Sequence, residues 1–402
     1  MLDSLSIANH ALVDFLRAEI KARGPTSFAW FMQQALYHPE HGYYSSGRAA
    51  IGRGGDYFTN VSVGPLFGGL LAAQFAEIWE KLGCPQNFTI VEQGAHEGEL
   101  ARDVLQAVRE RAPEFSATLR YVIIEPFSVL RDRQFTELKQ FDGKVQWCRS
   151  LEELEPFEGI HFSNELLDAM PVHLITSSGD GSREWRERAV GFDWNFFFSE
   201  REITDAELLE HVADFPVRPA GYTTEVNLAV LNWIDTLSTR LRRGFVIAID
   251  YGFVRDEFYV QHRRAGTLQV RAQHRVLESP LENIGEADIT AHVQWTSIAE
   301  RAEARGFQIA GFTDQHHFIT GIFSELGRGG SPEPPANANP SPGDWGQSPL
   351  PSPKTQRALQ TLMHPEFLGT RFQVLGLARN ADRTDLAGFA FARDARRTLG
   401  LN

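Results

Sequence analysis

Glycines and acidic side chains gather in the stretch VEQGAHEGEL, and this combination is typical of a cofactor site. An apolar run precedes the stretch and a helix-like run follows it, as in the strand, turn and helix that bind nucleotides. A nucleotide loop of the G-x-G-x-x-G kind would have a glycine where His96 stands. Glu92, Glu97 and Glu99 add three carboxylates to the same stretch. The stretch is therefore an altered nucleotide loop, an ordinary turn, or a loop for a different ligand.

The charge of this loop favours S-adenosylmethionine over NAD. NAD brings a pyrophosphate, which carboxylates at the entrance of a helix would repel. S-adenosylmethionine has no phosphate and carries a sulfonium and an ammonium, so nearby acids favour it. An acidic residue, Glu125, closes the next apolar run, where such a residue commonly binds ribose hydroxyls. We therefore predict a cofactor site that contains Glu92, Gly94, His96, Gly98 and Glu125.

A second polar group, in SNELLDAM, follows another apolar run and could meet a methyl acceptor. Methyl transfer requires that the acceptor be desolvated and aimed, so such an enzyme works mostly through positioning. Glu165 and Asp168 would share a face if residues 165–168 begin a helical turn. A carboxylate pair can hold a planar guanidinium bidentately. Asn164, Glu165 and Asp168 are our candidates for catalytic residues, with helix capping and turn formation as the alternative role.

Three further features bear on the site. The glycines of IGRGGDYFTN permit hinge motion and close backbone approach, so this stretch is either a lid over the cofactor or a surface loop. Asp250 ends an apolar run and either borders the site or caps the strand. His292 and the pair His316–His317 lack metal-ligand spacing, so no metal site is predicted.

Predicted strands and helices alternate from residue 88 onwards and form the frame for these residues. Apolar runs predict strands at 88–94, 119–125, 159–164, 245–252, 307–312 and 371–379. Helical periodicity predicts helices at 99–112, at 225–244 ending at Gly244, and at 290–306 with Thr290 as N-cap. This alternation predicts an α/β fold with a mainly parallel, doubly wound sheet.

The chain divides into two predicted parts. Residues 1–86 would form an N-terminal helical cap and the glycine-rich lid, because residues 8–22, 28–36 and 65–82 have helical spacing. Residues 87–402 would form the main α/β domain. Interruptions of the alternation are expected at about 172–201, as an antiparallel excursion, at about 253–288, and at the Pro-rich stretch 331–353.

Composition limits the class of protein and its partners. The chain has 402 residues and a formal net charge of −13, which argues against nucleic-acid binding and suits a cationic partner. Cys84 and Cys148 offer neither a disulfide framework nor zinc spacing, as in a reducing compartment. The first thirty residues resemble neither a secretory signal nor a transit peptide, and no apolar run approaches the ~20 residues of a membrane span. We expect a soluble cytoplasmic protein without membrane insertion, and its oligomeric state is open.

Ten motifs in this order resemble the MidA-like (DUF185) family of S-adenosylmethionine-dependent methyltransferases, over about residues 28–380. They are MQQALYHPEHGYY, IGRGGDYFTN with PLFG, VEQGAHEGEL, IEPFSVLRDRQ, SNELLDAMPVH, EWRERAV, IDYG, GTLQVRAQHRV, DITAHV and LMHPEFLGTRFQVL. The resemblance implies a class I methyltransferase, Rossmann-like sheet of seven strands, with an N-terminal helical cap and inserted excursions. It also implies S-adenosyl-L-methionine as cofactor.

The resemblance further implies a protein arginine side chain as acceptor, because mitochondrial members of the family are protein arginine methyltransferases that assist assembly of respiratory complex I. A respiratory-complex subunit is then a candidate partner. Gly55, Asp56 and Thr59 would border the active site. The family loop reads E-x-G-x-G-x-G-x-L, and this chain departs from it by placing His96 at the central glycine.

Two alternatives to a protein arginine methyltransferase stay open at this point. A methyltransferase of small molecules would have a closed pocket near Asn164 rather than a groove. A non-catalytic assembly factor would keep the fold and bind no S-adenosylmethionine.

Overall fold

The structure is a computed structural model that describes residues 9–47, 60–178, 184–213, 215–272, 275–328, 353–364, 368–382 and 384–401. The predicted lid residues Gly55, Asp56 and Thr59 lie outside the described residues, as does all but the last residue of the Pro-rich stretch 331–353.

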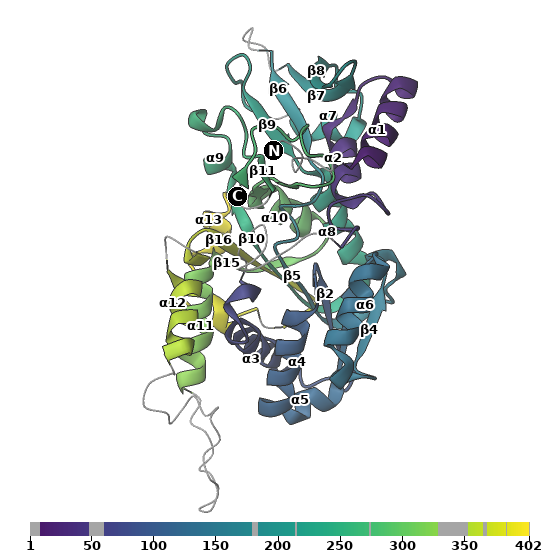
Figure 1. Ribbon diagram of the computed structural model, residues 1–402. Helices are drawn as coiled ribbons and strands as arrows, with labels where there is room; N and C mark the ends of the chain where they lie inside the picture. The colour runs from purple at the N-terminus through teal and green to yellow at the C-terminus, as the bar shows by residue number, and fades with distance from the viewer. Residues whose placement is uncertain are drawn as a thin grey trace, which may run out of the picture.

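One large sheet forms the centre of the chain (Figure 1). Its strands follow the order β15 (Gln308–Asp314), β16 (Phe372–Arg379), β10 (Leu241–Phe253), β5 (Phe157–Asn164), β2 (Phe88–Gln93), β3 (Leu119–Ile124) and β4 (Val145–Cys148). Neighbouring strands from β10 to β4 are parallel, whereas β16 is antiparallel to both of its neighbours. The short β14 (Val293–Gln294) pairs with the end of β10. The prediction of a mainly parallel α/β sheet with seven strands is confirmed, with β14 as an addition.

Helices cover both faces of this sheet. One apolar core joins the sheet to α3 (Leu66–Lys81), α4 (Glu99–Arg111) and α11 (Gln315–Arg328). The other joins it to α8 (Leu228–Arg240) and α10 (Trp295–Ala304). Successive strand residues point to opposite faces, so Ile90 belongs to the first core and Val91 to the second. Burial on both faces explains why these strands are continuous apolar runs in the sequence.

A second region lies beyond the main sheet, in the upper part of Figure 1. Its antiparallel sheet has the order β1 (Thr26–Ser27), β7 (Trp185–Phe192), β6 (His173–Ser177) and β9 (Thr223–Val226), with β8 (Phe196–Arg201) paired to β7. The helices α1 (His10–Arg23) and α2 (Phe28–Tyr37) pack with it in a third apolar core. A smaller sheet has the order β12 (Arg275–Val276), β11 (Gln269–Ala272) and β13 (Asp288–Thr290). The proposed division after residue 86 stays a prediction, and α3, which precedes that boundary, packs on the main sheet.

The helix predicted at 225–244 is shorter in the structure. Asn227 caps α8 by accepting a hydrogen bond from Val230 N–H at 3.0 Å, and β10 already begins at Leu241. Gly244 therefore does not end the helix but lies in the strand, at φ 136°. A Cβ at this position would lie 1.8 Å from the carbonyl oxygen of Gly159 in β5, so the close approach of two strands explains this glycine.

The sequence analysis also misplaces the start of one helix and omits one strand. Thr290 does not cap the next helix, because it belongs to β13, and α10 begins at Trp295 with Gln294 as its N-cap. The strand β4 was not predicted at all. It has only four residues, none of them fully buried, so its apolar signal is weak.

Candidate active site

A cavity of about 530 Å³ opens where β2, β3, β4 and β5 end at their carboxyl termini. This is the place where open α/β sheets bind ligands, and the volume lies in the range of ligand sites. The residues that line it are Tyr37, Tyr44, Gln93, Gly94, His96, Ile124, Glu125, Pro126, Phe127, Leu130, Arg149, Ser150, Leu151, Glu152, Glu165, Leu166, Ala169, Met170, Ala229, Asn232, Trp233 and Thr236.

The loop after β2 turns at three alternate residues with positive φ. Gly94 and Gly98 both have φ 85°, and His96 between them has φ 46°. His96 therefore takes a left-handed backbone conformation that favours glycine. Gly94 and His96 line the cavity, and Gly98 is the N-cap of α4. The loop is thus formed without its central glycine.

Glu92 lies at the base of this loop and is buried. Its carboxyl accepts a hydrogen bond from the Tyr121 hydroxyl at 2.7 Å. Burial raises the pKa of Glu92 to about 7, and the hydrogen bond from Tyr121 opposes this shift. Glu92 does not line the cavity, so a direct contact with the cofactor stays a prediction.

Glu125 lies beyond the end of β3 and lines the cavity. Its carboxyl accepts hydrogen bonds from Phe127 N–H at 3.0 Å and from Gln134 Nε2 at 3.1 Å. Burial raises the pKa of Glu125 to about 7, and both hydrogen bonds lower it. Gln134 also donates to the carbonyl of His96 at 2.7 Å. This buried glutamine, which the sequence reasoning missed, joins the two loops of the predicted cofactor site.

The loop after β5 begins with a left-handed residue rather than with the helical turn considered for residues 165–168. Glu165 has φ 52°, a left-handed conformation that non-glycine residues adopt at a cost of about 1–3 kcal/mol. Asp250 fixes the rest of the turn, because its Oδ2 accepts from the N–H groups of Leu166, Leu167 and Asp168 at 3.1, 2.7 and 3.3 Å. Asp250, which lies in β10, therefore caps the turn that follows the neighbouring strand β5.

The candidate catalytic residues lie together, but only one of them lines the cavity. Asn164 donates to Glu165 Oε1 at 2.9 Å and accepts from Asn60 Nδ2 at 2.9 Å. Glu165 lines the cavity, whereas Asp168 is buried near the carboxylates of Asp250, Asp288 and Glu165. Their roles in catalysis stay predictions, and their neighbour Asn60 is the last residue of the predicted lid stretch IGRGGDYFTN.

Burial and mutual repulsion raise the pKa values of the carboxyls in this acidic cluster. Burial raises the pKa of Glu165 to about 8, with a further upward contribution from Asp250. The pKa of Asp168 is also raised by burial and then by Asp250. In the described part of the chain, no ion pair joins Glu165, Asp168 or Asp250 to a basic side chain. A cation that enters the cavity would therefore stabilise the ionised form of Glu165.

An aromatic wall from the N-terminal segment faces the same cavity. Tyr37 at the end of α2 and Tyr44 beyond it line the cavity, and their rings stack with centroids 5.4 Å apart. The Tyr37 hydroxyl donates to the carbonyl of Ala169 at 3.0 Å. The sequence reasoning missed this wall, and its only signal was the motif YHPEHGYY.

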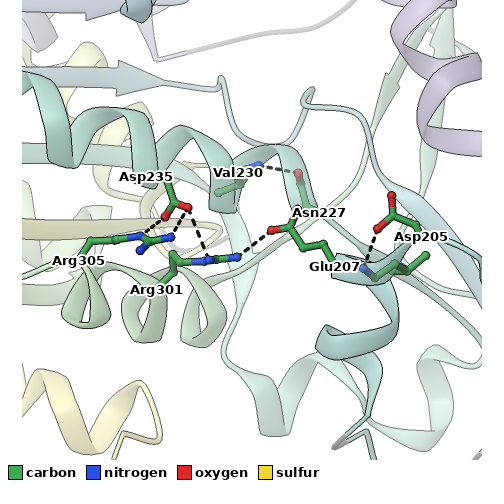
Figure 2. Close-up of polar contacts among 8 residues, drawn as sticks. Asp205, Glu207, Asn227, Val230, Asp235, Arg301 and Arg305 are labelled. Atoms are coloured by element: carbon green, nitrogen blue, oxygen red, sulfur yellow. Dashed lines mark hydrogen bonds and ion pairs between the residues drawn. The ribbon is translucent and has the colours of Figure 1, made fainter.

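The helix α8 supplies the remaining wall. Trp233 lines the cavity and donates from Nε1 to Gln93 Oε1 at 3.0 Å. On the same helix, Asp235 accepts hydrogen bonds from Arg305 Nε and Nη2 at 2.7 and 2.6 Å. Arg301 reaches Asp235 at 3.5 Å and also donates to Glu207 at 2.9 Å (Figure 2). These contacts join α8 to α10 and to α7 (Ala206–Val212).

The lining of the cavity fits a cationic ligand without phosphates. The carboxyl groups of Glu125, Glu152 and Glu165 line the cavity, and among the described residues that line it one guanidinium is present, that of Arg149. A pyrophosphate would be repelled by this excess of acids, whereas a sulfonium and an ammonium would be stabilised. Ile124 and other apolar side chains provide a surface for an aromatic base. The residues therefore fit S-adenosylmethionine. Within the described residues no group of His, Cys, Asp and Glu could hold a metal ion.

Comparison with known proteins gives a consistent result. Residues 70–313 match the model of a family described as “Putative S-adenosyl-L-methionine-dependent methyltransferase”. A crystal structure of a COG1565 superfamily member from Burkholderia thailandensis, bound to S-adenosyl-homocysteine, is 31% identical. The alignment covers 97% of each chain, with a TM-score of 0.81. A native structure from the same organism and superfamily is 30% identical over 97% of each chain, with a TM-score of 0.79.

Curated relatives are more distant in sequence. “Protein arginine methyltransferase NDUFAF7 homolog, mitochondrial” of Drosophila melanogaster is 26% identical over 94% of this chain and 89% of its own. “Protein arginine methyltransferase NDUFAF7, mitochondrial” of Homo sapiens is 24% identical over 76% of this chain and 71% of its own.

These names correct one expectation from the sequence. The prediction of a cytoplasmic protein is contradicted, because the relatives are named mitochondrial. The cysteine pattern behind that prediction indicates only a reducing compartment and does not say which one. Among the helices that the structure describes, none has the length and apolar character needed to cross a bilayer.

Proposed function

The chain belongs to the family of S-adenosyl-L-methionine-dependent methyltransferases that matches residues 70–313, and from this premise we propose that it methylates an arginine side chain of a protein partner. S-adenosylmethionine is its cofactor and supplies an electrophilic methyl group. The resemblance to the MidA-like family makes a subunit of a respiratory complex the first candidate partner. The relatives named protein arginine methyltransferase support the acceptor.

One observation of the site supports a cationic acceptor most directly: the carboxyl of Glu165 in the cavity wall, backed by Asp168 and Asp250. Within the described residues these carboxyls have no basic side chain as ion-pair partner. Burying several carboxyls together costs free energy unless a cation compensates them. A guanidinium is always charged and offers a planar edge of N–H donors that matches one carboxylate.

The cofactor would lie along the loops that follow β2 and β3. Gly94 and His96 would bring main-chain groups close to the cofactor, and Glu125 would accept hydrogen bonds from its ribose hydroxyls. Gln134 holds Glu125 and the carbonyl of His96 in one arrangement. These assignments are part of the proposal.

Glu165 has two tasks in the proposed reaction. Its carboxylate would accept N–H bonds from the guanidinium and so direct one nitrogen toward the methyl donor. The acceptor nitrogen loses a proton when it is methylated, and a Glu165 oxygen can take that proton because the site favours its protonated form. Asn164, which donates to Glu165 Oε1 at 2.9 Å, fixes the orientation of the carboxyl.

The test uses extracts of a strain that lacks the protein. The protein or its variant is added together with isotope-labelled S-adenosylmethionine, and methylation of the extract is measured. We expect label on arginine, and for Glu165→Gln a loss of at least about a hundredfold in rate. Cofactor affinity, measured by calorimetry, should stay within a few-fold of the unaltered protein. Glu202→Gln, at an exposed position of the same residue type, is the matched control and should keep full activity.

Three results would contradict the proposal. Label on a residue other than arginine would show a different acceptor, and label only on small molecules would show a small-molecule methyltransferase. Full activity of Glu165→Gln with the cofactor bound would remove Glu165 from the mechanism.

A further inference from the structure

We propose that Tyr37 and Tyr44 form an aromatic wall against which the acceptor guanidinium lies flat while Glu165 holds its edge. The inference rests on the proposed arginine methylation and adds how the acceptor is recognised. Both tyrosines precede residue 70, where the match to the family model begins. The N-terminal segment would therefore be part of the acceptor site.

The chain reversal after α2 brings the two tyrosines together. Tyr43 N–H and Tyr44 N–H donate to the carbonyls of Ala35 and Leu36, both at 3.0 Å. Gly42 permits this reversal, because a Cβ there would lie 2.6 Å from the carbonyl oxygen of Leu36. The ring of Tyr44 consequently stacks on that of Tyr37, with an interplanar angle of 27°.

The hydroxyl of each ring donates one hydrogen bond to a distant part of the chain. Tyr37 donates to the carbonyl of Ala169, which belongs to the loop that carries Glu165. Tyr44 donates to Asp288 Oδ1 at 2.7 Å, on the strand β13. A third contact lies just beyond Tyr44, where Arg133 donates to the carbonyl of Gly47 at 2.8 Å. The rings are thus preorganised before an acceptor arrives.

The wall and the carboxyl belong to one cavity, which Tyr37, Tyr44 and Glu165 all line. An aromatic face attracts a cation, and a planar cation can stack on it while its edge stays free for a carboxylate. A lysine ammonium is compact and tetrahedral, so it cannot use the ring face and the carboxyl edge in the same way. The arrangement therefore selects arginine over lysine.

The first experiment measures steady-state kinetics with an arginine peptide that the unaltered protein methylates. For Tyr37→Leu and for Tyr44→Leu we expect KM to rise about tenfold, with kcat changed less. Tyr44→Phe keeps the ring and loses only the hydrogen bond to Asp288, so its KM should rise less than that of Tyr44→Leu. Phe15→Leu is the matched control, because Phe15 is a partly buried aromatic residue of the N-terminal segment that does not line the cavity.

The second experiment measures the unaltered protein, and variants serve only to assign its signals. Tyrosine ring signals of the intact protein, bound to S-adenosylhomocysteine, are followed by NMR while the arginine peptide is added, with assignment from Tyr→Phe variants. Signals of Tyr37 and Tyr44 should shift saturably, whereas that of Tyr121, which binds Glu92, should not. The corresponding lysine peptide should produce much smaller shifts.

The outcomes separate this inference from the proposed function. If no arginine peptide or protein is methylated by the unaltered protein, the proposed function fails. If arginine is methylated but the leucine variants keep their KM, or the ring signals stay still, the aromatic wall is refuted. A parallel loss of S-adenosylmethionine affinity in calorimetry would assign the wall to the cofactor and would also refute it.

Discussion

His96 shows how one residue can take over the conformation of a glycine. Its φ of 46° lies between two glycines with φ 85°, so the loop requires positive φ at all three positions. The sequence alone left open whether His96 damages the loop, because a backbone conformation cannot be read from a residue type. The structure shows that the turn forms and that the cost is local strain.

We expect His96→Gly to raise the free energy of unfolding, because the backbone strain at positive φ is relieved. The gain should be no more than about 1 kcal/mol, because the greater freedom of glycine in the unfolded chain offsets part of it. His96→Val should lower it by about 1–2 kcal/mol, since a β-branched residue tolerates positive φ poorly. Urea unfolding measures both changes. Asn283→Gly, at φ 47° and away from the cavity, is the control that separates strain relief from cofactor binding.

Calorimetry then decides what the histidine side chain does. Unchanged S-adenosylmethionine affinity in His96→Gly means that the residue serves only the turn. A weaker affinity means that the imidazole contacts the cofactor, and a much tighter one means that the strain limits binding.

Glu165 should make stability and activity depend on pH in opposite directions. Its folded pKa of about 8 lies above the ordinary value of 4.5, so its contribution to stability is fully present below pH 4.5 and is lost as pH rises through 8. Relative to the unaltered protein, Glu165→Gln should therefore become more stable as pH rises from about 5 to about 9. Urea unfolding at several pH values measures this difference. Glu202→Gln is the control, and its stability relative to the unaltered protein should not change with pH.

The activity should show the opposite trend, because the guanidinium binds the ionised carboxylate. We expect kcat/KM for an arginine peptide to rise with pH until about 8, the pKa of Glu165 in the free enzyme. A profile that is already flat from about pH 6 would mean that the carboxyl is ionised or that it does not contact the acceptor.

At the scale of elements, ion pairs between side chains connect α8, which forms one wall of the cavity, to a neighbouring helix. Asp235 links it to Arg305 and Arg301 of the neighbouring α10 segment (Figure 2). These groups are partly exposed, at 28% for Asp235 and 44% for Arg305, so solvent screens them. The network is thus suited to fixing the position of α8 more than to adding much stability.

Asp235→Asn should lower the free energy of unfolding by no more than about 1 kcal/mol. It should also weaken the affinity for S-adenosylmethionine by roughly twofold to fivefold. The reason is that α8 carries Trp233, which holds Gln93 in the cavity wall. Urea unfolding and calorimetry measure the two effects. Glu300→Gln breaks a pair with Arg255 of similar exposure and should leave the affinity unchanged. Equal affinity losses in both variants would show a general effect of destabilisation.

The elements that follow a regular pattern were predictable, and those defined by distant contacts were not. Long apolar runs located six of the seven main strands, and the carboxyl-end rule placed Gly94, Glu125 and Glu165 in one cavity. The missing strand β4 is short and half-buried. A helical turn that begins at Glu165, which the sequence left open, does not form, because Asp250, a distant residue in the sequence, binds the backbone of a different turn.

At the scale of the whole molecule, the cavity combines segments that no local pattern connects. The Tyr37 hydroxyl and the carbonyl of Ala169 that it binds are separated by 132 positions in the chain. Tertiary packing of α2 against the antiparallel sheet creates this contact. The motif YHPEHGYY therefore marked a reversal of the chain, but its partner could be found only in the folded structure.

The formal charge of −13 acts on a cationic acceptor before any contact forms. Such a field speeds the encounter with a basic peptide, and salt screens it over about 10 Å at an ionic strength of about 0.1 M. We expect kcat/KM for an arginine-rich peptide to fall about tenfold between roughly 20 mM and 300 mM salt. An arginine peptide of zero net charge is the control, since its kcat/KM should change much less. Equal salt dependence for both peptides would mean that the local carboxyl of Glu165, and not the overall charge, governs recognition of the acceptor.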